Sequence, residues 1–540
     1  MIFNSIEFFI FLPIVYLIYC RLAHRPQNIF LLAASYFFYG WWDIRFLYLI
    51  TLSTSVDYCC GILIDKGAIT GRQLASAVGY AALASLWFLG LGNYMLEYDL
   101  LQTLWMTAAG LGASVGFFLL VFVLERRARG LSMEHKRGVY LAASMIINLG
   151  ILAAFKYFNF FIDSAQTVLS GLGISDISLV TLNVVLPVGI SFYTFQTMSY
   201  SIDIYRRKIN SCEDYLDFAL FVSYFPQLVA GPIERASHLL PAIRSPRTLK
   251  LQQTIDGIGL IGYGLFKKVV IADGLAGAVD AVYGTSGTVS SLDIAIATLF
   301  FALQIYCDFS GYTDIARGVS KMLGIELMLN FRLPYFSRSP SEFWQRWHIS
   351  LSSWLRDYLY IPLGGNRGGT FATYKNLMTT MLLGGLWHGA AWNFVLWGGY
   401  HGFLLCVYRA VPEAFHSWWS RSWIRANVGF WLSMAVFFVL TLYGWLLFRA
   451  VSFEQIATFT SSLVHLDGLG APLTVPAPPF SALLGLPILL GYEVVSFAAE
   501  KGRHPLISFR ILRPALHGLM LFAFIASLST PPAQFIYFQF

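Results

Sequence analysis

The sequence has few charged residues. Asp, Glu, Lys and Arg together make up 12% of its 540 residues, whereas hydrophobic residues make up 57%. Apolar runs long enough to cross a bilayer recur from one end of the chain to the other. This composition excludes a soluble globular protein and indicates an all-α integral membrane protein that crosses the bilayer many times.

An excess of acidic residues is also missing, and the formal net charge is +7. The basic residues lie in short loops between the apolar runs, which is the distribution that sets the orientation of membrane proteins. We therefore interpret the positive charge as a topology signal and predict no nucleic-acid partner. Membrane lipids and an anionic donor are the expected secondary partners of these residues.

The sequence lacks metal-ligand or redox spacing among its cysteines, which are therefore interpreted as packing residues. Three histidines, His348, His388 and His401, are a possible ligand set, but no carboxylate or cysteine lies at a ligand spacing among them. We expect no metal site and no bound cofactor. The sequence also lacks an internal repeat, which argues against a transporter, the alternative from a different functional class.

The chain is predicted to contain about 11–13 transmembrane or re-entrant helices. The loop Glu125–Arg137 contains five Lys and Arg residues and is therefore expected on the cytoplasmic side. Counting spans back from this loop places the amino terminus outside. In segment 215–240, Pro226, Gly231 and Pro232 lie too close together for a regular span, so it is either a re-entrant or broken segment or a kinked ordinary span.

The stretch Asn376–Tyr408 contains no Asp, Glu, Lys or Arg. A continuous helix of that length would reach roughly 50 Å, well beyond a hydrocarbon core of about 30 Å, so one straight span is not expected. Glycines allow the backbone to bend, and residues 376–410 are predicted to form a broken helix. His388 lies beside this bend, and a titratable side chain in such an apolar setting is a functional-site hypothesis.

Region 331–375 is predicted to lie on the cytoplasmic side and to contain an amphipathic helix followed by a glycine-rich loop. Ser339 and Glu342 have the spacing of a capping box, and the helix should then run toward Tyr360. His348 lies at the edge of its apolar stripe, which turns the imidazole inward toward protein. The alternative is an interfacial membrane helix on which this histidine only makes a packing contact.

Two further polar segments carry weaker signals. The loop Leu363–Gly369, LGGNRGG, has backbone amides and Arg367 that suit an anionic group, but it lacks the terminal Lys-Ser/Thr of a P-loop. Asp308 and Asp314 lie in or near the membrane. They are expected to fix a hydrogen-bonded helix junction, with Asp314 paired to Arg317, and a proton relay is the alternative.

Two long motifs resemble a known family. LPYFSRSPSEFWQRWHISLSSWLRDYLYIPLGGNRGG and LLGGLWHGAAWNFVLWGGYHG are similar to motifs of the membrane-bound O-acyltransferase family. The likeness is to its bacterial branch, which contains the alginate O-acetylation protein and relatives acting on peptidoglycan, cellulose and teichoic acid. YFPQLVAGPIERA and DFSGYTDIA fit the same branch, so the resemblance covers nearly the whole chain.

The resemblance implies one membrane domain over residues 1–540, built as a ring of helices around a thinned centre with a tunnel between cytoplasm and outer face. It implies that His388, in the LWHG motif, is the catalytic residue and that His348, in the WHIS motif, is the second site residue. Compared with the family pattern, the chain carries an extra pair of apolar spans within residues 74–124. An even number of inserted spans preserves the topology downstream.

The expected reaction moves an acetyl group from a cytoplasmic thioester, acetyl-CoA by resemblance, across the bacterial inner membrane. A periplasmic acetyltransferase partner would then complete O-acetylation of an extracytoplasmic glycan such as alginate-like exopolysaccharide, cellulose or peptidoglycan. Direct transfer is expected, because neither histidine has a Ser or Cys in a nucleophile motif nearby. The alternatives within the family are D-alanyl transfer and acylation of a lipid or protein. Arginines are expected to contact the donor phosphates, and these are Arg338, Arg346, Arg356 and Arg367.

Overall fold

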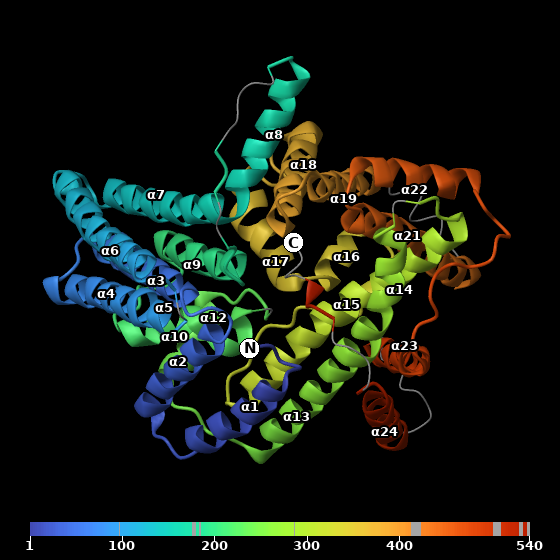
Figure 1. Cartoon of the computed structure of the whole chain (residues 1–540), viewed down its shortest axis with the longest axis horizontal. Coiled ribbons are helices and arrows are strands. Elements are labelled where there is room, and N and C mark those ends of the chain that lie inside the picture. The colour runs from blue at the N-terminus through green and yellow to red at the C-terminus, as the bar shows by residue number, and fades with distance from the viewer. Residues whose placement is uncertain are drawn as a thin grey trace. The chain divides into compact units, whose positions relative to one another are not determined.

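The computed structural model describes residues 1–96, 98–174, 180–182, 185–229, 231–285, 287–411, 423–500, 509–528 and 533–536. Helices make up most of this part of the chain, and no strand occurs within it (Figure 1). Seven helical spans within it are long and apolar enough to cross a membrane. The protein is therefore an all-α, multi-pass membrane protein, as its composition predicts. The total of 11–13 spans and re-entrant helices, the ring, the tunnel and the orientation of the amino terminus stay predictions.

The described residues form two compact units, and the expectation of one membrane domain stays a prediction. The first unit contains residues 1–257 and 319–327. Its helices are α1 (Ile6–Tyr19), α2 (His24–Gly40), α3 (Phe46–Lys66), α4 (Gly71–Ala84), α5 (Gly92–Met95), α6 (Leu100–Ala128), α7 (Met133–Leu152), α8 (Phe158–Gly171), α9 (Ile190–Tyr205), α10 (Tyr215–Ser223), α11 (Phe225–Leu228) and α12 (Ala236–Arg244).

The second unit contains residues 258–318 and 328–540, as far as they are described. Two helices contribute residues to both units, α13 (Leu251–Leu265) and α15 (Ser291–Met322). The other helices of the second unit are α14 (Asp273–Tyr283), α16 (Pro340–Arg346), α17 (Ile349–Leu355), α18 (Gly369–His388), α19 (Trp392–Ala410), α21 (Trp423–Arg449), α22 (Phe453–His465), α23 (Phe480–Glu500) and α24 (Phe509–Ala526). Short π-helical segments extend four helices, and they are Ser85–Leu91, Ala153–Tyr157, Phe266–Ala272 and Arg356–Tyr360.

The predicted extra pair of apolar spans is present as two long helical spans, Gly71–Met95 and Leu100–Ala128. Thr70 and Gln73 form a complete capping box at the start of the first span. The Asp99 carboxylate accepts two backbone N–H groups at the start of the second. Basic residues in the last turn of the second span lie at the negative end of its helix dipole, where positive charge is stabilising. Whether relatives lack this pair stays a prediction.

Segment 215–240 is broken, not a kinked continuous span. It contains α10, α11 and the start of α12 as separate short helices. Pro226 lies in the first turn of α11, where its missing N–H costs no hydrogen bond. At Gly231 a Cβ atom would lie 2.4 Å from the Gln227 Cα, so only glycine lets the chain pass there. Of the two alternatives, the structure therefore shows the broken segment.

The Asn376–Tyr408 stretch is divided between two helices, α18 and α19, which pack against each other (Figure 1). The chain leaves α18 at Gly389, which has an extended backbone. The predicted break beside His388 is thus confirmed. The glycines within the helices do more than permit a bend, because Gly385 and Gly398 meet at the contact between the helix backbones. A Cβ at Gly398 would lie 2.2 Å from the Met381 carbonyl oxygen.

This contact predicts a sharp difference between two adjacent glycines. Gly398→Ala is expected to destabilise the fold by about 1–3 kcal/mol or more, because the backbone of α18 would have to move. At Gly399 a Cβ would meet only the Leu382 side chain, at 3.4 Å. Gly399→Ala is therefore the matched control and should leave stability nearly unchanged. Thermal unfolding midpoints of the two purified variants test this, and equal midpoints would contradict the close-contact explanation.

Candidate active site

His388 is the last residue of α18 and is held in an aromatic pocket. Its ring centroid lies 5.1 Å from that of Trp387, 5.1 Å from that of Trp397 and 5.7 Å from that of Phe448. The residue is only 4% exposed. Because α18 ends here, the imidazole is fixed by packing on two other helices, α19 and α21, and not by its own helix alone. The sequence predicts His388 beside the bend, and in the structure it is the last helical residue before the turn.

His348 lies at a break that the sequence reasoning did not foresee. The predicted continuous helix toward Tyr360 is wrong, because α16 ends at Arg346 and α17 begins at Ile349. Between them His348 has a left-handed backbone, with φ +43°. A non-glycine residue in this conformation costs roughly 1–3 kcal/mol and occurs where the surroundings enforce it, often at functional sites. The inward orientation of the imidazole is confirmed, since His348 is fully buried.

Backbone hydrogen bonds from a neighbouring segment enforce this break. The Arg346 carbonyl accepts the Arg332 N–H at 2.9 Å, and the Ile349 N–H donates to the Asn330 carbonyl at 2.9 Å. These bonds occupy groups that a continuous helix would have used internally.

The capping box that starts α16 is only half formed. Ser339 Oγ accepts the Glu342 N–H, but the Glu342 carboxylate accepts the N–H of Arg338, the residue before the cap.

Asn330 fixes the tautomer of His348. Its Oδ1 atom accepts the Ser350 N–H at 3.2 Å and the Ser350 hydroxyl at 2.9 Å, and lies 3.1 Å from His348 Nδ1. A backbone N–H can only donate, so the amide atom facing it must be the oxygen. His348 Nδ1 therefore donates as well, and the basic lone pair lies on Nε2. Sequence reasoning missed Asn330; its only local signal is a polar residue just before the LPYFSRSP motif.

The two histidines converge, with ring centroids 6.4 Å apart. Phe309 covers His348 from α15 at 4.7 Å in an edge-on contact. Burial lowers the pKa of the His348 imidazole well below its ordinary value of 6.5, and the nearby His388 lowers it further. His348 is therefore neutral at physiological pH, as a hydrogen-bond acceptor or base must be.

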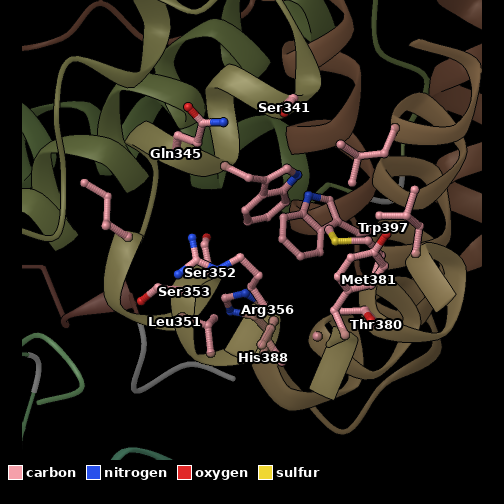
Figure 2. A pocket seen from close by; sticks show the side chains of 17 residues that line it. Ser341, Gln345, Leu351, Ser352, Ser353, Arg356, Thr380, Met381, His388 and Trp397 are labelled. Atoms are coloured by element: carbon pink, nitrogen blue, oxygen red, sulfur yellow. The ribbon is translucent and has the colours of Figure 1, made fainter. Parts of the chain in front are cut away.

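A cavity of about 390 Å³ opens against His388 (Figure 2). Its walls come from α16 and α17 on one side and from α18 and α19 on the other, and they include Leu351, Met381 and Trp397. Polar side chains also line the cavity, and these are Ser341, Gln345, Ser352, Ser353, Arg356, Tyr360, Thr380 and His388. A cavity of this size that combines apolar walls with convergent polar groups is typical of a small-molecule site. His348 is not among the residues that line it.

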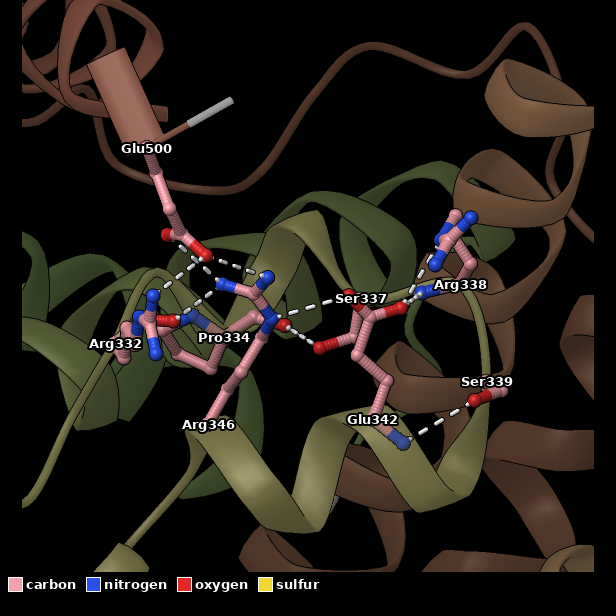
Figure 3. A network of polar contacts seen from close by, with 8 residues as sticks. All are labelled: Arg332, Pro334, Ser337, Arg338, Ser339, Glu342, Arg346 and Glu500. Carbon is pink, nitrogen blue, oxygen red and sulfur yellow. Dashed lines mark hydrogen bonds and ion pairs between the residues drawn. The ribbon is translucent and has the colours of Figure 1, made fainter. Parts of the chain in front are cut away.

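Of the four arginines expected at the donor, only Arg356 lines this cavity. Arg338 and Arg346 both pair with Glu342, at 3.1 and 3.2 Å (Figure 3). Arg346 also pairs with Glu500 on α23, at 3.1 Å, and Arg332 pairs with the same carboxylate. This network joins α16 to the end of α23. Arg367 lies exposed in the glycine-rich loop. The role of these four residues toward the donor stays a prediction.

Asp308 and Asp314 lie in ion pairs at a junction of helices. Asp314 pairs with Lys267 and, as predicted, with Arg317, at 3.4 Å. Asp308 pairs with Lys268 at 2.8 Å. Sequence reasoning missed the two lysines because they lie inside an apolar stretch. This junction could have been predicted from the two lysines in one apolar stretch and the two aspartates in another, since buried charges are paired.

His401 packs against Trp397 and Trp344, which line the cavity, but it is not itself among the lining residues. Its ring centroid is 4.8 Å from that of Trp397 and 5.9 Å from the stacked ring of Phe343. It is 1% exposed and faces Gly444 on α21, where a Cβ would come within 3.0 Å of Nε2. Within the described residues, no group of three or more His, Cys, Asp or Glu side chains has the geometry to hold a metal ion.

The chain is similar to known proteins over most of its length. The sequence model of the membrane-bound O-acyltransferase family matches residues 207–446, which include both histidines. The probable alginate O-acetylase of Azotobacter vinelandii is 36% identical over 457 residues, which is 84% of this chain and 76% of that protein. The chain belongs to the membrane-bound O-acyltransferase family. It is therefore a membrane-embedded O-acyltransferase.

Other relatives of this O-acyltransferase are named for different substrates. The peptidoglycan O-acetyltransferase of Helicobacter pylori is 30% identical, and the match covers 87% of this chain and 81% of that protein. The teichoic acid D-alanyltransferase of Streptococcus thermophilus is 29% identical over 237 residues, which is 41% of this chain and 56% of that protein. The two O-acetylating relatives are thus similar over most of the chain, and the D-alanyltransferase over less than half of it.

Proposed function

We propose that this O-acyltransferase takes an acetyl group from cytoplasmic acetyl-CoA and moves it across the bacterial inner membrane for O-acetylation of an extracytoplasmic polysaccharide. The observation that carries the proposal is the buried pair of histidines beside an apolar cavity, with His388 in its wall. The long similarity to proteins named for O-acetylation of alginate and of peptidoglycan supports acetyl as the group. A periplasmic acetyltransferase would accept the group and complete its transfer to the glycan.

In this proposal His388 acts as general base. It takes the proton of the acceptor hydroxyl as that oxygen attacks the thioester carbonyl carbon. A C–O bond forms, the C–S bond breaks, and the leaving thiolate of coenzyme A takes up a proton, so that the histidine returns to its neutral form. The apolar walls exclude bulk water, which protects the thioester from hydrolysis. His348, with its lone pair on Nε2, would accept a hydrogen bond from a reacting group or from the protonated His388.

Arg356 is proposed to contact the donor, because it lines the cavity. Its side chain is 64% exposed. Its Nε–H already donates a hydrogen bond to the adjacent Asp357 at 2.8 Å, so fewer N–H groups remain for acetyl-CoA. Exposed ion pairs contribute about 0.2–1 kcal/mol. Arg356→Ala should therefore raise the KM for acetyl-CoA about two- to fivefold with little change in kcat. Arg338→Ala, which removes an arginine held by Glu342 outside the cavity, should leave KM unchanged. Equal effects of the two variants would remove Arg356 from the donor site.

The proposed function is tested with membrane vesicles whose cytoplasmic face is outward. Vesicles carrying the wild-type protein receive acetyl-CoA labelled in the acetyl group, and label that is released from protein and glycan by mild base is counted. The control vesicles carry His388→Ala at equal abundance. Label that depends on His388 supports the proposal, and the fraction that holds the label identifies the acceptor.

A second arm supplies labelled D-alanine with its activating enzyme and carrier protein instead of acetyl-CoA. Transfer of D-alanine and not of acetate would overturn the choice of acyl group while leaving the O-acyltransferase assignment intact. If neither label is transferred by the wild-type protein while its abundance and fold are normal, the proposed donors are both wrong.

A further inference from the structure

A second buried polar cluster lies in the first unit, where α3, α7 and α9 pack together (Figure 1). Asp57 of α3 is fully buried in a helix that is apolar and long enough to span the membrane. Around it lie Ser144 and Asn148 of α7 and Thr197 and Ser201 of α9, each at most 2% exposed. Each of these pairs has an i, i+4 spacing, which places both side chains on one face of the helix. The proposed acyl transfer uses none of these residues.

The hydrogen bonds in this cluster are unevenly divided between the two carboxylate oxygens. Asp57 Oδ1 accepts the Ser144 hydroxyl at 2.9 Å and the Asn148 Nδ2–H at 2.7 Å. Ser144 Oγ also lies 3.0 Å from Ser201 Oγ, and the Thr197 hydroxyl donates to the Asn148 amide oxygen at 3.2 Å. Asp57 Oδ2 is buried and has no hydrogen-bond partner of ordinary geometry within the described part of the chain, although the Thr197 hydroxyl also interacts with this carboxyl group.

The charge of Asp57 has no cationic side chain beside it. No ion pair to this carboxylate occurs among the described residues, and its titratable neighbours are Cys60 on α3 and Tyr200 on α9. An uncompensated carboxylate buried among apolar helices is strongly unfavourable, so either a proton or a cation must neutralise it. A proton on Oδ2 would leave the remaining lone pair of that oxygen without a donor, and a proton on Oδ1 would compete with two donors already present.

A small cation removes both difficulties. It needs lone pairs, which Oδ2 supplies, and it leaves the two hydrogen bonds to Oδ1 in place. The other atoms available nearby are hydroxyl and amide oxygens, and hard cations prefer oxygen ligands. A single carboxylate provides one negative charge, which matches a monovalent ion and not a divalent one.

We propose that the Asp57 cluster is a binding site for one Na⁺ ion, with Asp57 Oδ2 as the charged ligand and hydroxyl and amide oxygens of α7 and α9 completing the shell. The ion joins three helices that belong to one compact unit. Its binding therefore stabilises that unit, whatever acyl group the protein transfers.

The test uses the purified full-length protein in detergent and the midpoint of thermal unfolding. The salt is changed from choline chloride to NaCl at constant ionic strength. Na⁺ should raise the midpoint saturably, by about 1–3 °C at ten times the dissociation constant. Asp57→Asn should abolish this response. The matched control is Asp65→Asn on the same helix, because the Asp65 carboxylate bonds Ser211 outside the cluster, and this variant should keep the response.

Direct binding keeps the proposal testable if Asp57→Asn does not fold. Equilibrium binding of ²²Na⁺ to the wild-type protein should saturate at about one ion per chain and weaken as the pH falls, since protons compete for the same carboxylate. Absence of stoichiometric binding would overturn the proposal. The proposal would also be overturned if the unfolding midpoint did not respond to Na⁺ but changed with pH, and if this pH dependence were lost in Asp57→Asn. That result would show that Asp57 is neutralised by a proton.

Discussion

Replacing His388 by alanine should lower the rate of acyl transfer about 10²- to 10⁴-fold, which is the usual contribution of a general base. The side chain lies in the wall of the cavity and packs against Trp387 and Trp397, so the rate has to be compared per folded protein. The measurement is the initial rate with saturating donor, normalised to folded protein in the membrane. Abundance of the variant should stay close to that of the wild type.

The matched control removes a histidine elsewhere. His465 lies exposed at the end of α22, where its ring contacts only Ser461 of its own helix among the described residues. His465→Ala should keep the full rate. A His388→Ala protein that retains more than about a tenth of the wild-type rate would exclude the general-base role. Loss of a general base lowers the rate by at least about a hundredfold.

The second large effect is expected at Asn330, a positioning residue that acts through His348. Asn330→Ala leaves His348 Nδ1–H and the Ser350 N–H without their acceptor in a buried site. Each buried donor left unsatisfied costs about 1–3 kcal/mol, and the imidazole is free to take the other tautomer. We expect kcat to fall about 10- to 100-fold, with a smaller change in KM.

Two further variants separate positioning from a general loss of structure. Asn330→Asp keeps an oxygen acceptor at the same place and should recover part of kcat. Ser350→Ala removes one hydroxyl donor but keeps the backbone N–H, and should change kcat less than about threefold. If the alanine and aspartate variants of Asn330 have the same kcat per folded protein, the hydrogen bond to His348 has no role in the reaction.

Local chemistry made several features predictable. The break after His388 follows from the length of an uncharged stretch, which is too great for one span, together with the glycine beside the histidine. The Ser339 cap was predictable because a serine before a proline satisfies a free N–H in the first helical turn. The Asp314–Arg317 pair follows from an i, i+3 spacing on one helix. Each of these depends on residues close together in the sequence.

The break at His348 was not predictable in this way. Helical periodicity through Trp344, Trp347, Leu351 and Trp354 is continuous in the sequence, yet the helix is interrupted. The cause is an outside segment, whose Asn330 and Arg332 take backbone partners from the helix. Likewise, Ser350 falls on the polar side of the predicted helix but is fully buried, because the break turns it toward Asn330.

By itself the sequence determined the class of the protein, its apolar helices, the two histidines and the family that their motifs resemble. These properties are carried by composition, by hydrophobic run length and by contiguous motifs, all of which can be read along the chain. Only the tertiary structure decided that the two imidazoles converge, that Asn330 sets the tautomer of His348, that Arg346 is held by Glu500 and that Asp57 is buried without a cationic partner. Each of these depends on atoms from segments far apart in sequence, and their approach is set by the packing of whole helices, which no local pattern specifies.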